Sequence, residues 1–214
     1  MNNHTSPYSL AFAPPSLAAR YREHDLDAAD RARLRTTPHL SERPQWRTSR
    51  ALLAHLRNAY PGYIPCLSHK HDHALVALGR HKPGADLESL RTRNYFALAA
   101  HSFTAQEQDW LRAHPEPQSA FYQLWTLKEA LIKAENLRFP AGLRQTGLHG
   151  GELFSVSRRP YRWLTLCLDE HWIISAVWPD IGTHRPHFLT ATPSTRLMRL
   201  AGNLPAPLLK TLTI

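Results

Sequence analysis

The part of the chain that most restricts its fold is a long helical pattern from Ala120 to Asn136. Apolar residues recur at helical spacing within it and predict one buried face: Leu124, Leu127 and Leu131. Trp125, Glu129 and Lys133 follow one another every four residues, along the border of that face. A glutamate four residues before a lysine is ordinarily an exposed pair that contributes about 0.2–0.5 kcal/mol, so this row alone does not indicate a functional site.

Other segments carry helical and strand-like patterns. Helical patterns occupy residues 25–35, 46–60 and 94–113, the last interrupted near residues 101–104. After this interruption, Thr104 and Glu107 have the spacing of a helix N-cap and its reciprocal partner. Strand-like patterns occupy residues 73–78, 84–88, 151–157, 162–169 and 171–179. Residues 1–20 are rich in proline and predict a loop or a short edge strand, and no pattern is assigned after Pro179.

The order of these segments predicts an α+β protein. Helices followed by strands occur twice, so we expect two similar αβ halves, residues 1–92 and 93–214. A chain of 214 residues is large for one domain and small for two.

The charge and the cysteine content narrow the class of protein. The formal net charge is +9 and the pI is near 10.0, which favours an acidic partner: a nucleic acid, a phosphorylated small molecule or an acidic protein. Cys66 and Cys167 belong to no CxxC pair and cannot form a disulfide framework, so we expect a cytoplasmic protein. The N-terminal stretch lacks the basic leader of a signal peptide, and no apolar run is long enough to span a bilayer.

Two carboxylates lie close together in the segment "GADLE". On a strand, Asp86 and Glu88 would share one face, while Leu87 would face the core. Mg²⁺ prefers oxygen ligands and retains several waters, so such a pair is a reasonable start for a magnesium site. Acidic residues that are merely solvated at a strand end would look the same. Glu129 could supply a third carboxylate.

Several segments, taken together, resemble the Sfp-type 4′-phosphopantetheinyl transferases of the holo-acyl-carrier-protein synthase superfamily. The paired family signatures are Gly-x-Asp-x-Glu and Trp-x-x-Lys-Glu-(Ala/Ser)-x-x-Lys, which this chain has at residues 84–88 and 125–133. It also has the upstream pair Ser68-His69, and residues 103–107 are similar to the Phe-(Thr/Ser)-x-x-Glu element of the family. The resemblance covers about residues 40–180, in consistent order and spacing.

The resemblance implies an activity and the residues that carry it. Members of the family transfer the 4′-phosphopantetheine arm of coenzyme A to a serine of an apo acyl or peptidyl carrier protein and release 3′,5′-ADP. Asp86, Glu88 and Glu129 would hold Mg²⁺, with Mn²⁺ as an alternative. Glu129 would also be the base towards the serine, and Lys133 would assist the leaving group. Coenzyme A contacts are implied for a larger set: Arg47, Arg50, Ser68, His69, Asp86, Lys128 and Lys133. For Lys128, a position facing the carrier protein or water stays open.

The resemblance also implies a monomer built as a pseudo-dimer, with the site in the cleft between the two halves. Asp86 and Glu88 would come from the first half, and Glu129 and Lys133 from the second. An acidic carrier protein and an anionic coenzyme would account for the charge of +9. The chain lacks the Gly-Lys-Pro element that precedes Ser68 in the family, and the Ala-x-Gly-x-Gly element after Lys133. These departures leave open a degenerate member that binds carrier protein without full activity.

Two other classes of function compete with this interpretation. His69, His71 and His73 alternate, so on an extended segment they would share one face and could hold Zn²⁺ in a hydrolase. The arginine-rich stretch of residues 31–50 could neutralise the phosphates of a nucleic acid, but no helix-turn-helix, zinc-finger or RRM signature accompanies it. We therefore expect neither a zinc site nor nucleic-acid binding, and no membrane association.

Overall fold

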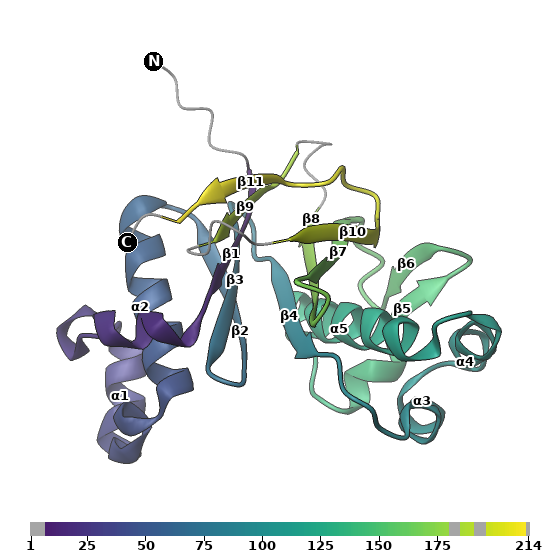
Figure 1. Cartoon of the computed structure of the whole chain (residues 1–214), viewed down its shortest axis with the longest axis horizontal. Coiled ribbons are helices and arrows are strands. Elements are labelled where there is room, and N and C mark those ends of the chain that lie inside the picture. Colours follow the sequence, from purple (N-terminus) through teal and green to yellow (C-terminus); the bar gives the residue numbers. More distant parts are fainter. Residues whose placement is uncertain (1–6, 180–184, 191–195, 213–214) are drawn as a thin grey trace.

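The computed structural model describes residues 7–179, 185–190 and 196–212, which form two large β-sheets and the helices that cover them (Figure 1). The first sheet has five strands in the order β11 (Leu208–Thr211), β9 (His187–Thr190), β1 (Tyr8–Ala13), β3 (His73–Gly79) and β2 (Ile64–Lys70). Strand β1 runs antiparallel to β3 and parallel to β9. The edge strands are β11 and β2.

The second sheet has four antiparallel strands in the order β10 (Leu197–Gly202), β7 (Tyr161–Leu168), β8 (Trp172–Pro179) and β4 (Gly84–Ser89). A separate hairpin joins β5 (Thr146–His149) and β6 (Glu152–Ser155). Strand β4 is therefore an edge of the second sheet, as β2 is of the first.

Five α-helices connect or cover these strands: α1 (Ala28–Thr36), α2 (Pro44–Ala59), α3 (Tyr95–Ser102), α4 (Ala105–Ala113) and α5 (Pro117–Glu135). Four short 3-10 helices complete the described part of the chain: η1 (Pro15–Arg20), η2 (Glu23–Asp25), η3 (Pro38–Glu42) and η4 (Ala141–Arg144). The helical patterns expected from the sequence are thus confirmed, including the Thr104–Glu107 capping box at the start of α4.

The two sheets pack face to face, with one long helix on each outer side. Apolar side chains of both sheets form one shared core, in which Leu10 and Leu75 of the first sheet meet Leu87 and Ile174 of the second. The indole Nε1 of Trp178 donates a hydrogen bond of 2.9 Å to the Leu78 carbonyl and so links the sheets. Helix α2 packs on the outer face of the first sheet, and α5 on the outer face of the second, as Figure 1 shows. The layers are therefore helix, sheet, sheet and helix.

The N-terminal strand differs from its prediction. Instead of a loop or an edge strand, β1 lies inside the first sheet, between β9 and β3. All six of its residues are buried, so no alternation of polar and apolar residues marks it in the sequence. The tail left unassigned after Pro179 supplies strands β9, β10 and β11, while residues 180–184, 191–195 and 213–214 lie outside the described part.

The α+β class is confirmed, but the sheets do not follow the expected boundary at residue 92. Strand β4 precedes that boundary and pairs with β8, whereas β9 and β11 follow it and belong to the first sheet. Each sheet therefore contains strands from both sides of residue 92. The turn after β3 takes the chain to the second sheet, where β4 lies, and the chain returns to the first sheet with β9 and β11. A pseudo-dimeric relation between residues 1–92 and 93–214 stays a prediction.

Two findings bear on the expected class of protein. Cys66 and Cys167 are free and buried, as expected for a chain without a disulfide framework. None of the described helices combines the length and the apolar character that a membrane span requires.

Candidate active site

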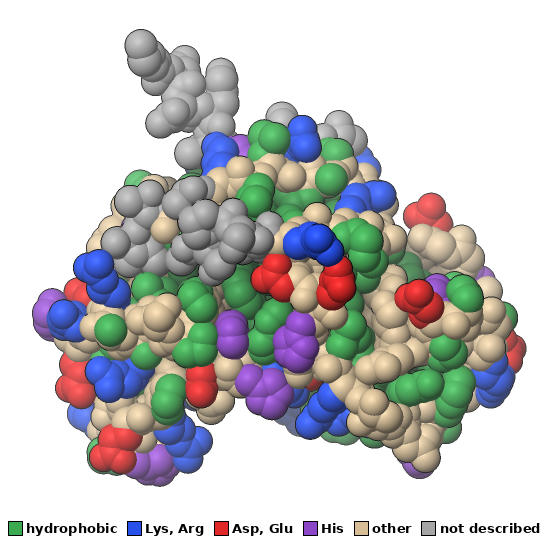
Figure 2. Space-filling view, viewed as in Figure 1, with side chains coloured by type: hydrophobic (Ala, Val, Ile, Leu, Met, Phe, Trp, Pro, Cys, Tyr) green, Lys and Arg blue, Asp and Glu red, His purple; other side chains and the backbone are tan. Residues whose placement is uncertain are grey.

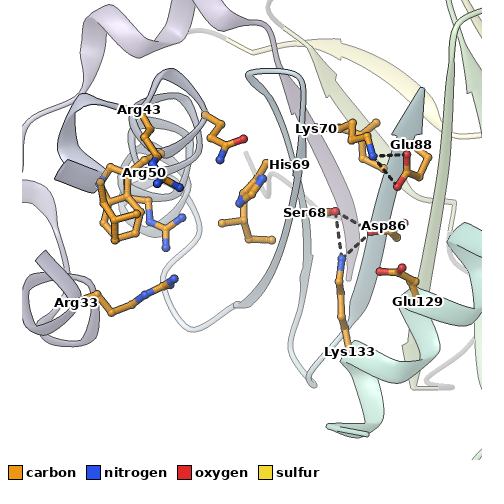
Figure 3. Close-up of a pocket in the computed structure, with 15 residues that line it drawn as sticks. Arg33, Arg43, Arg50, Ser68, His69, Lys70, Asp86, Glu88, Glu129 and Lys133 are labelled. Atoms are coloured by element: carbon orange, nitrogen blue, oxygen red, sulfur yellow. Dashed lines mark hydrogen bonds and ion pairs between the residues drawn. The ribbon is translucent and has the colours of Figure 1, made fainter. Parts of the chain in front are cut away.

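The candidate site lies where the two sheets meet at their edge strands, β2 and β4. Ser68 and Lys70 point from β2 towards β4, and Asp86 and Glu88 point back from β4 (Figure 3). The Ser68 hydroxyl donates to Asp86 Oδ1 at 2.8 Å. Lys70 Nζ donates to Glu88 Oε1 at 3.0 Å and lies 2.8 Å from Oε2. Because side chains alternate along a strand, these two contacts form successive cross-links on one face.

Helix α5 brings two more charged side chains to the same place. Lys133 Nζ donates to Asp86 Oδ1 at 2.7 Å, to Ser68 Oγ at 3.1 Å and to the Ala85 carbonyl at 3.0 Å. Glu129 lies one turn before Lys133 and faces Asp86, as Figure 3 shows. No hydrogen bond reaches the Glu129 carboxylate from any residue that the structure describes. This carboxylate is therefore available to a ligand.

The close approach of α5 to β4 explains the glycine of the Gly-x-Asp-x-Glu element. A Cβ atom on Gly84 would occupy the place of the Ala130 carbonyl of α5. Only glycine lets the helix backbone lie this close to the strand. The glycine therefore fixes how near Glu129 and Lys133 come to Asp86.

The charges at the site alter the protonation of both helix residues. Burial and the neighbouring Asp86 and Glu88 carboxylates raise the pKa of Glu129 to about 7, although Lys133 acts in the opposite sense. Burial disfavours the charged form of Lys133, but the Asp86 carboxylate, with smaller contributions from Cys66 and Glu129, outweighs burial and raises the pKa of this lysine. Near neutral pH, Glu129 can thus both accept and release a proton, while Lys133 stays cationic.

The carboxylates suit a divalent cation, although they do not form a preassembled cage. Within the described ranges, no three His, Cys, Asp or Glu side chains converge closely enough to hold a metal ion by themselves. Asp86 Oδ2, however, is buried without a hydrogen-bond partner, and Glu129 lies beside it. Mg²⁺ commonly binds one or two carboxylates and completes its shell with water and substrate phosphates. Asp86 and Glu129 meet that requirement, with Glu88 next to them.

A cavity of 580 Å³ extends from these carboxylates towards α1 and α2. Its far end is basic, with Arg33, Arg43 and Arg50, and its wall includes the indole of Trp46. Figure 3 shows the three arginines on the side of the cavity opposite Asp86, Glu88 and Glu129. A cavity with cations at one end and an aromatic wall can accept an anionic nucleotide.

Of the seven residues predicted to contact coenzyme A, five line this cavity and two, Arg47 and Lys128, do not. Ser68, His69, Asp86, Lys133 and Arg50 all line this cavity. Burial and the Arg50 cation lower the pKa of His69, so its ring is neutral near pH 7.

The two predicted arginines differ in position. The Arg50 guanidinium lies 3.8 Å from the centre of the Trp46 ring and pairs with Asp30 at 2.8 and 3.0 Å. Arg47 is absent from the cavity lining, and its guanidinium instead lies over the ring of Tyr21, 5.7 Å from its centre. A direct coenzyme contact by Arg47 therefore has no support from its position.

The expected contact of Lys128 with coenzyme A is wrong. Its side chain is fully buried, on the side of α5 away from the cavity. Lys128 Nζ binds both Glu107 carboxylate oxygens, at 2.9 and 2.7 Å, and the Thr146 carbonyl at 2.6 Å. Burial lowers the pKa of this lysine, and the Glu107 charge acts against the shift. Lys128 therefore joins α4, α5 and β5 and cannot reach coenzyme, carrier or water.

Three charged residues of the cavity were not singled out as site residues from the sequence: Arg33, Arg43 and Lys70. Lys70 stands two residues after Ser68, and this spacing alone would have placed both on one face of a strand. Arg33 and Arg43 stood out only as part of an arginine-rich stretch. No local pattern connects them to the distant carboxylates.

The histidine series does not form a common face. Strand β2 ends at Lys70, and His71 and Asp72 form the turn with positive φ angles of 44° and 62°. His73 begins β3 and packs beside Trp172, with ring centres 4.6 Å apart. Histidine side chains gather near the middle of the face in Figure 2, where lysine and arginine side chains are scattered among acidic ones. The turn at His71 removes the common face on which the zinc alternative depends, and the basic side chains do not form a continuous surface on the face that Figure 2 draws.

Comparisons with known proteins agree with the geometry. Residues 82–175 match the family model of the 4′-phosphopantetheinyl transferase superfamily. A putative 4′-phosphopantetheinyl transferase of Haemophilus influenzae is 36% identical over 52 residues, which are 24% of this chain and 22% of that protein. The 4′-phosphopantetheinyl transferase HetI of a Nostoc species is 39% identical over 82 residues, 36% of this chain and 35% of that protein. The matches thus span well under half of either relative. The segment matched by the family model runs from β4 into β8, includes all of α5 and so carries Asp86, Glu88, Glu129 and Lys133; over this segment the chain is similar to the 4′-phosphopantetheinyl transferase superfamily.

Proposed function

We propose that this protein transfers the 4′-phosphopantetheine arm of coenzyme A to a serine of an apo acyl or peptidyl carrier protein. The observation that carries the proposal is the Glu129 carboxylate, which has a pKa of about 7 and lies beside Asp86 and Lys133 at the end of a basic cavity. The similarity of residues 82–175 to the superfamily model and the names of the two relatives support a transferase of this class.

The reaction forms one bond and breaks one. The serine oxygen attacks the diphosphate phosphorus that carries the pantetheine arm, and the bond from this phosphorus to the bridging oxygen breaks, so 3′,5′-ADP leaves. Glu129 accepts the serine proton, a role that suits a carboxylate whose pKa is near neutrality. The Lys133 ammonium stabilises the negative charge that develops on the leaving phosphate.

The remaining cavity residues bind and orient the coenzyme in this proposal. Arg33 and Arg43 present their cations to the phosphates at the nucleotide end, and the neutral His69 ring and Ser68 contact the nucleotide. Asp86 and Glu129, with Glu88 beside them, would hold Mg²⁺ or Mn²⁺, which when bound neutralises the diphosphate charge. An acidic carrier protein fits the net charge of +9, and we propose that the chain acts as a monomer in the cytoplasm.

Mass spectrometry of the carrier tests this function. The chain is incubated with several apo carrier proteins, coenzyme A and Mg²⁺, and a mass gain of one phosphopantetheine group is expected. Glu129→Ala should abolish the gain, whereas Glu152→Ala, an exposed glutamate on β6, should leave it intact. Absence of any gain with all carriers would contradict the proposal. Carrier binding without a mass gain would instead support the degenerate, binding-only alternative.

A further inference from the structure

Lys70 and Glu88 form an ion pair inside the candidate metal site. The proposed reaction gives this ion pair no role. The Lys70 ammonium lies 3.0 and 2.8 Å from the two Glu88 carboxylate oxygens. The side chains are 24% and 14% exposed, so both are largely shielded from water. An ion pair with this shielding is stronger than a fully solvated one. Glu88 is thus already provided with a cation by its own chain.

The two lysines of the site are held very differently. Lys133 donates to three oxygen atoms, on Asp86, Ser68 and Ala85, and is therefore fixed in place. Among the described residues, the Glu88 carboxylate is the only one that Lys70 contacts by a hydrogen bond or an ion pair. A flexible lysine with a single ionic partner can leave that partner at the cost of one ion pair. Asp86 Oδ2 and Glu88 Oε2 are both buried without a hydrogen-bond partner, but only the Glu88 oxygen has a lysine ammonium as close as 2.8 Å, that of Lys70.

We infer that Lys70 is a built-in competitor of the divalent cation for Glu88 and thereby sets the metal affinity of the site. The inference rests on the proposed function for the role of the metal. A divalent cation binds Asp86 and Glu129, while the Lys70 charge next to Glu88 repels it and keeps that carboxylate out of its shell. Removal of the Lys70 charge converts a site with two available carboxylates into one with three. Lys70 is thus a residue that determines affinity, without contact with the reacting atoms.

Titration with Mn²⁺ tests this competition without any measurement of activity. Binding is followed by calorimetry and by the electron paramagnetic resonance signal of free Mn²⁺, at one fixed pH, for the full chain and its variants. Lys70→Met should bind Mn²⁺ about fivefold or more tightly than the unaltered chain, because one opposing ion pair of this kind is lost. Lys70→Arg keeps the charge and should bind like the unaltered chain. Lys210→Met removes an exposed lysine on β11, at the edge of the first sheet opposite β2, and should change nothing.

A second substitution separates competition for Glu88 from a general effect of charge. Glu88→Gln should change Mn²⁺ affinity by less than about twofold in the unaltered chain, but should abolish the gain in the Lys70→Met background. Equal affinities of Lys70→Met and the unaltered chain would overturn the inference, as would failure of both to bind Mn²⁺. The inference would also be overturned if Glu88→Gln lowered the Mn²⁺ affinity equally in the unaltered chain and in Lys70→Met. If Lys70→Met fails to fold, Lys70→Gln replaces it, with the same expectations.

The carrier assay on the same preparations keeps the two proposals apart. If the chain modifies a carrier, but Lys70→Met binds Mn²⁺ with the same affinity as the unaltered chain, this inference is contradicted and the proposed function is not. A chain that shows the expected Mn²⁺ affinities, yet modifies no carrier, contradicts the proposed function alone.

Discussion

The burial of Glu129 beside other carboxylates makes the free energy of unfolding depend on pH. Its carboxyl has a pKa of about 7 in the folded protein, against an ordinary value of 4.5. As the pH rises from about 4.5 to about 7, the unfolded chain loses this proton first and the folded chain keeps it. The free energy of unfolding therefore falls across this window, because folding favours the protonated form.

Glu129→Gln should remove this pH dependence, since glutamine does not titrate. The difference in free energy of unfolding between the variant and the unaltered protein should depend on pH. It should be roughly 1–3 kcal/mol more in favour of the variant at pH 8 than at pH 4.5. Urea unfolding of both proteins at the two pH values measures this change. Glu152→Gln, at an exposed position, should show no such trend. A difference between Glu129→Gln and the unaltered protein that stays constant with pH would contradict the raised pKa.

At this scale, sequence spacing located residues on regular elements well. Asp86 and Glu88 share a strand face, and Glu129 and Lys133 share a helix edge, because both periodicities are local properties of the backbone. That these four side chains meet at one site also required the family resemblance. Lys128 was misplaced because its environment depends on Glu107, a residue 21 positions earlier in the chain. Helical spacing does not reveal such a partner.

The contact between β4 and α5 is the element-scale feature on which the site depends. Gly84→Ala would place a methyl group where the Ala130 carbonyl lies, so the helix and the strand must separate. We expect a loss of about 1–3 kcal/mol in free energy of unfolding, measured by urea titration, since overpacking of this kind has that cost. The separation should also reduce transferase activity, because Glu129 and Lys133 move away from Asp86.

A matched glycine serves as the control for this prediction. Gly150 lies in the turn between β5 and β6 with a φ of 57°, and a Cβ atom there would meet nothing within 4 Å. Gly150→Ala introduces only a local backbone cost and should leave transferase activity unchanged. If Gly84→Ala kept full stability and activity, the close approach of α5 would not be needed for either.

The Lys128–Glu107 pair joins three elements in the interior. Lys128→Met leaves the Glu107 carboxylate buried without its cation, so we expect a loss of about 3–5 kcal/mol in free energy of unfolding. The double variant Lys128→Met/Glu107→Gln should recover part of this loss, because no buried charge then remains unpaired. Urea unfolding of the unaltered protein, of the single variants Lys128→Met and Glu107→Gln, and of the double variant measures the coupling. The KM for coenzyme A of folded Lys128→Met should stay unchanged. A large increase in this KM would favour the contact between Lys128 and coenzyme A that was expected from the sequence.

At the scale of the whole molecule, the face-to-face packing of two sheets places the site. Strands β2 and β4 are edges of different sheets, and their meeting joins the basic cavity of the first layer to the carboxylates of the second. The sequence predicted the class and most elements, but not which sheet each strand would join. Strand membership depends on long-range pairing, and fully buried strands such as β1 lack the alternation that would reveal their faces.

Strand β1 is paired on both sides within the first sheet. Ala11 is fully buried and lies opposite Val76 of β3 and Leu189 of β9. Ala11→Pro removes a backbone N–H from a strand that has neighbours on both sides, which proline tolerates only at sheet edges. We expect a loss of about 3 kcal/mol or more in free energy of unfolding, measured by urea titration.

Ala11→Gly distinguishes the lost hydrogen bond from other effects at the same position. Glycine keeps the N–H group and should cost only about 0.5–1 kcal/mol. If both variants lost equally little, β1 would behave as the edge strand or loop that its proline-rich surroundings suggest. A large difference between them would place the N-terminal strand among the elements that hold the first sheet together. The basic wall of the cavity is built on that sheet through α2 and β2, so Ala11→Pro should also weaken coenzyme binding in whatever fraction remains folded.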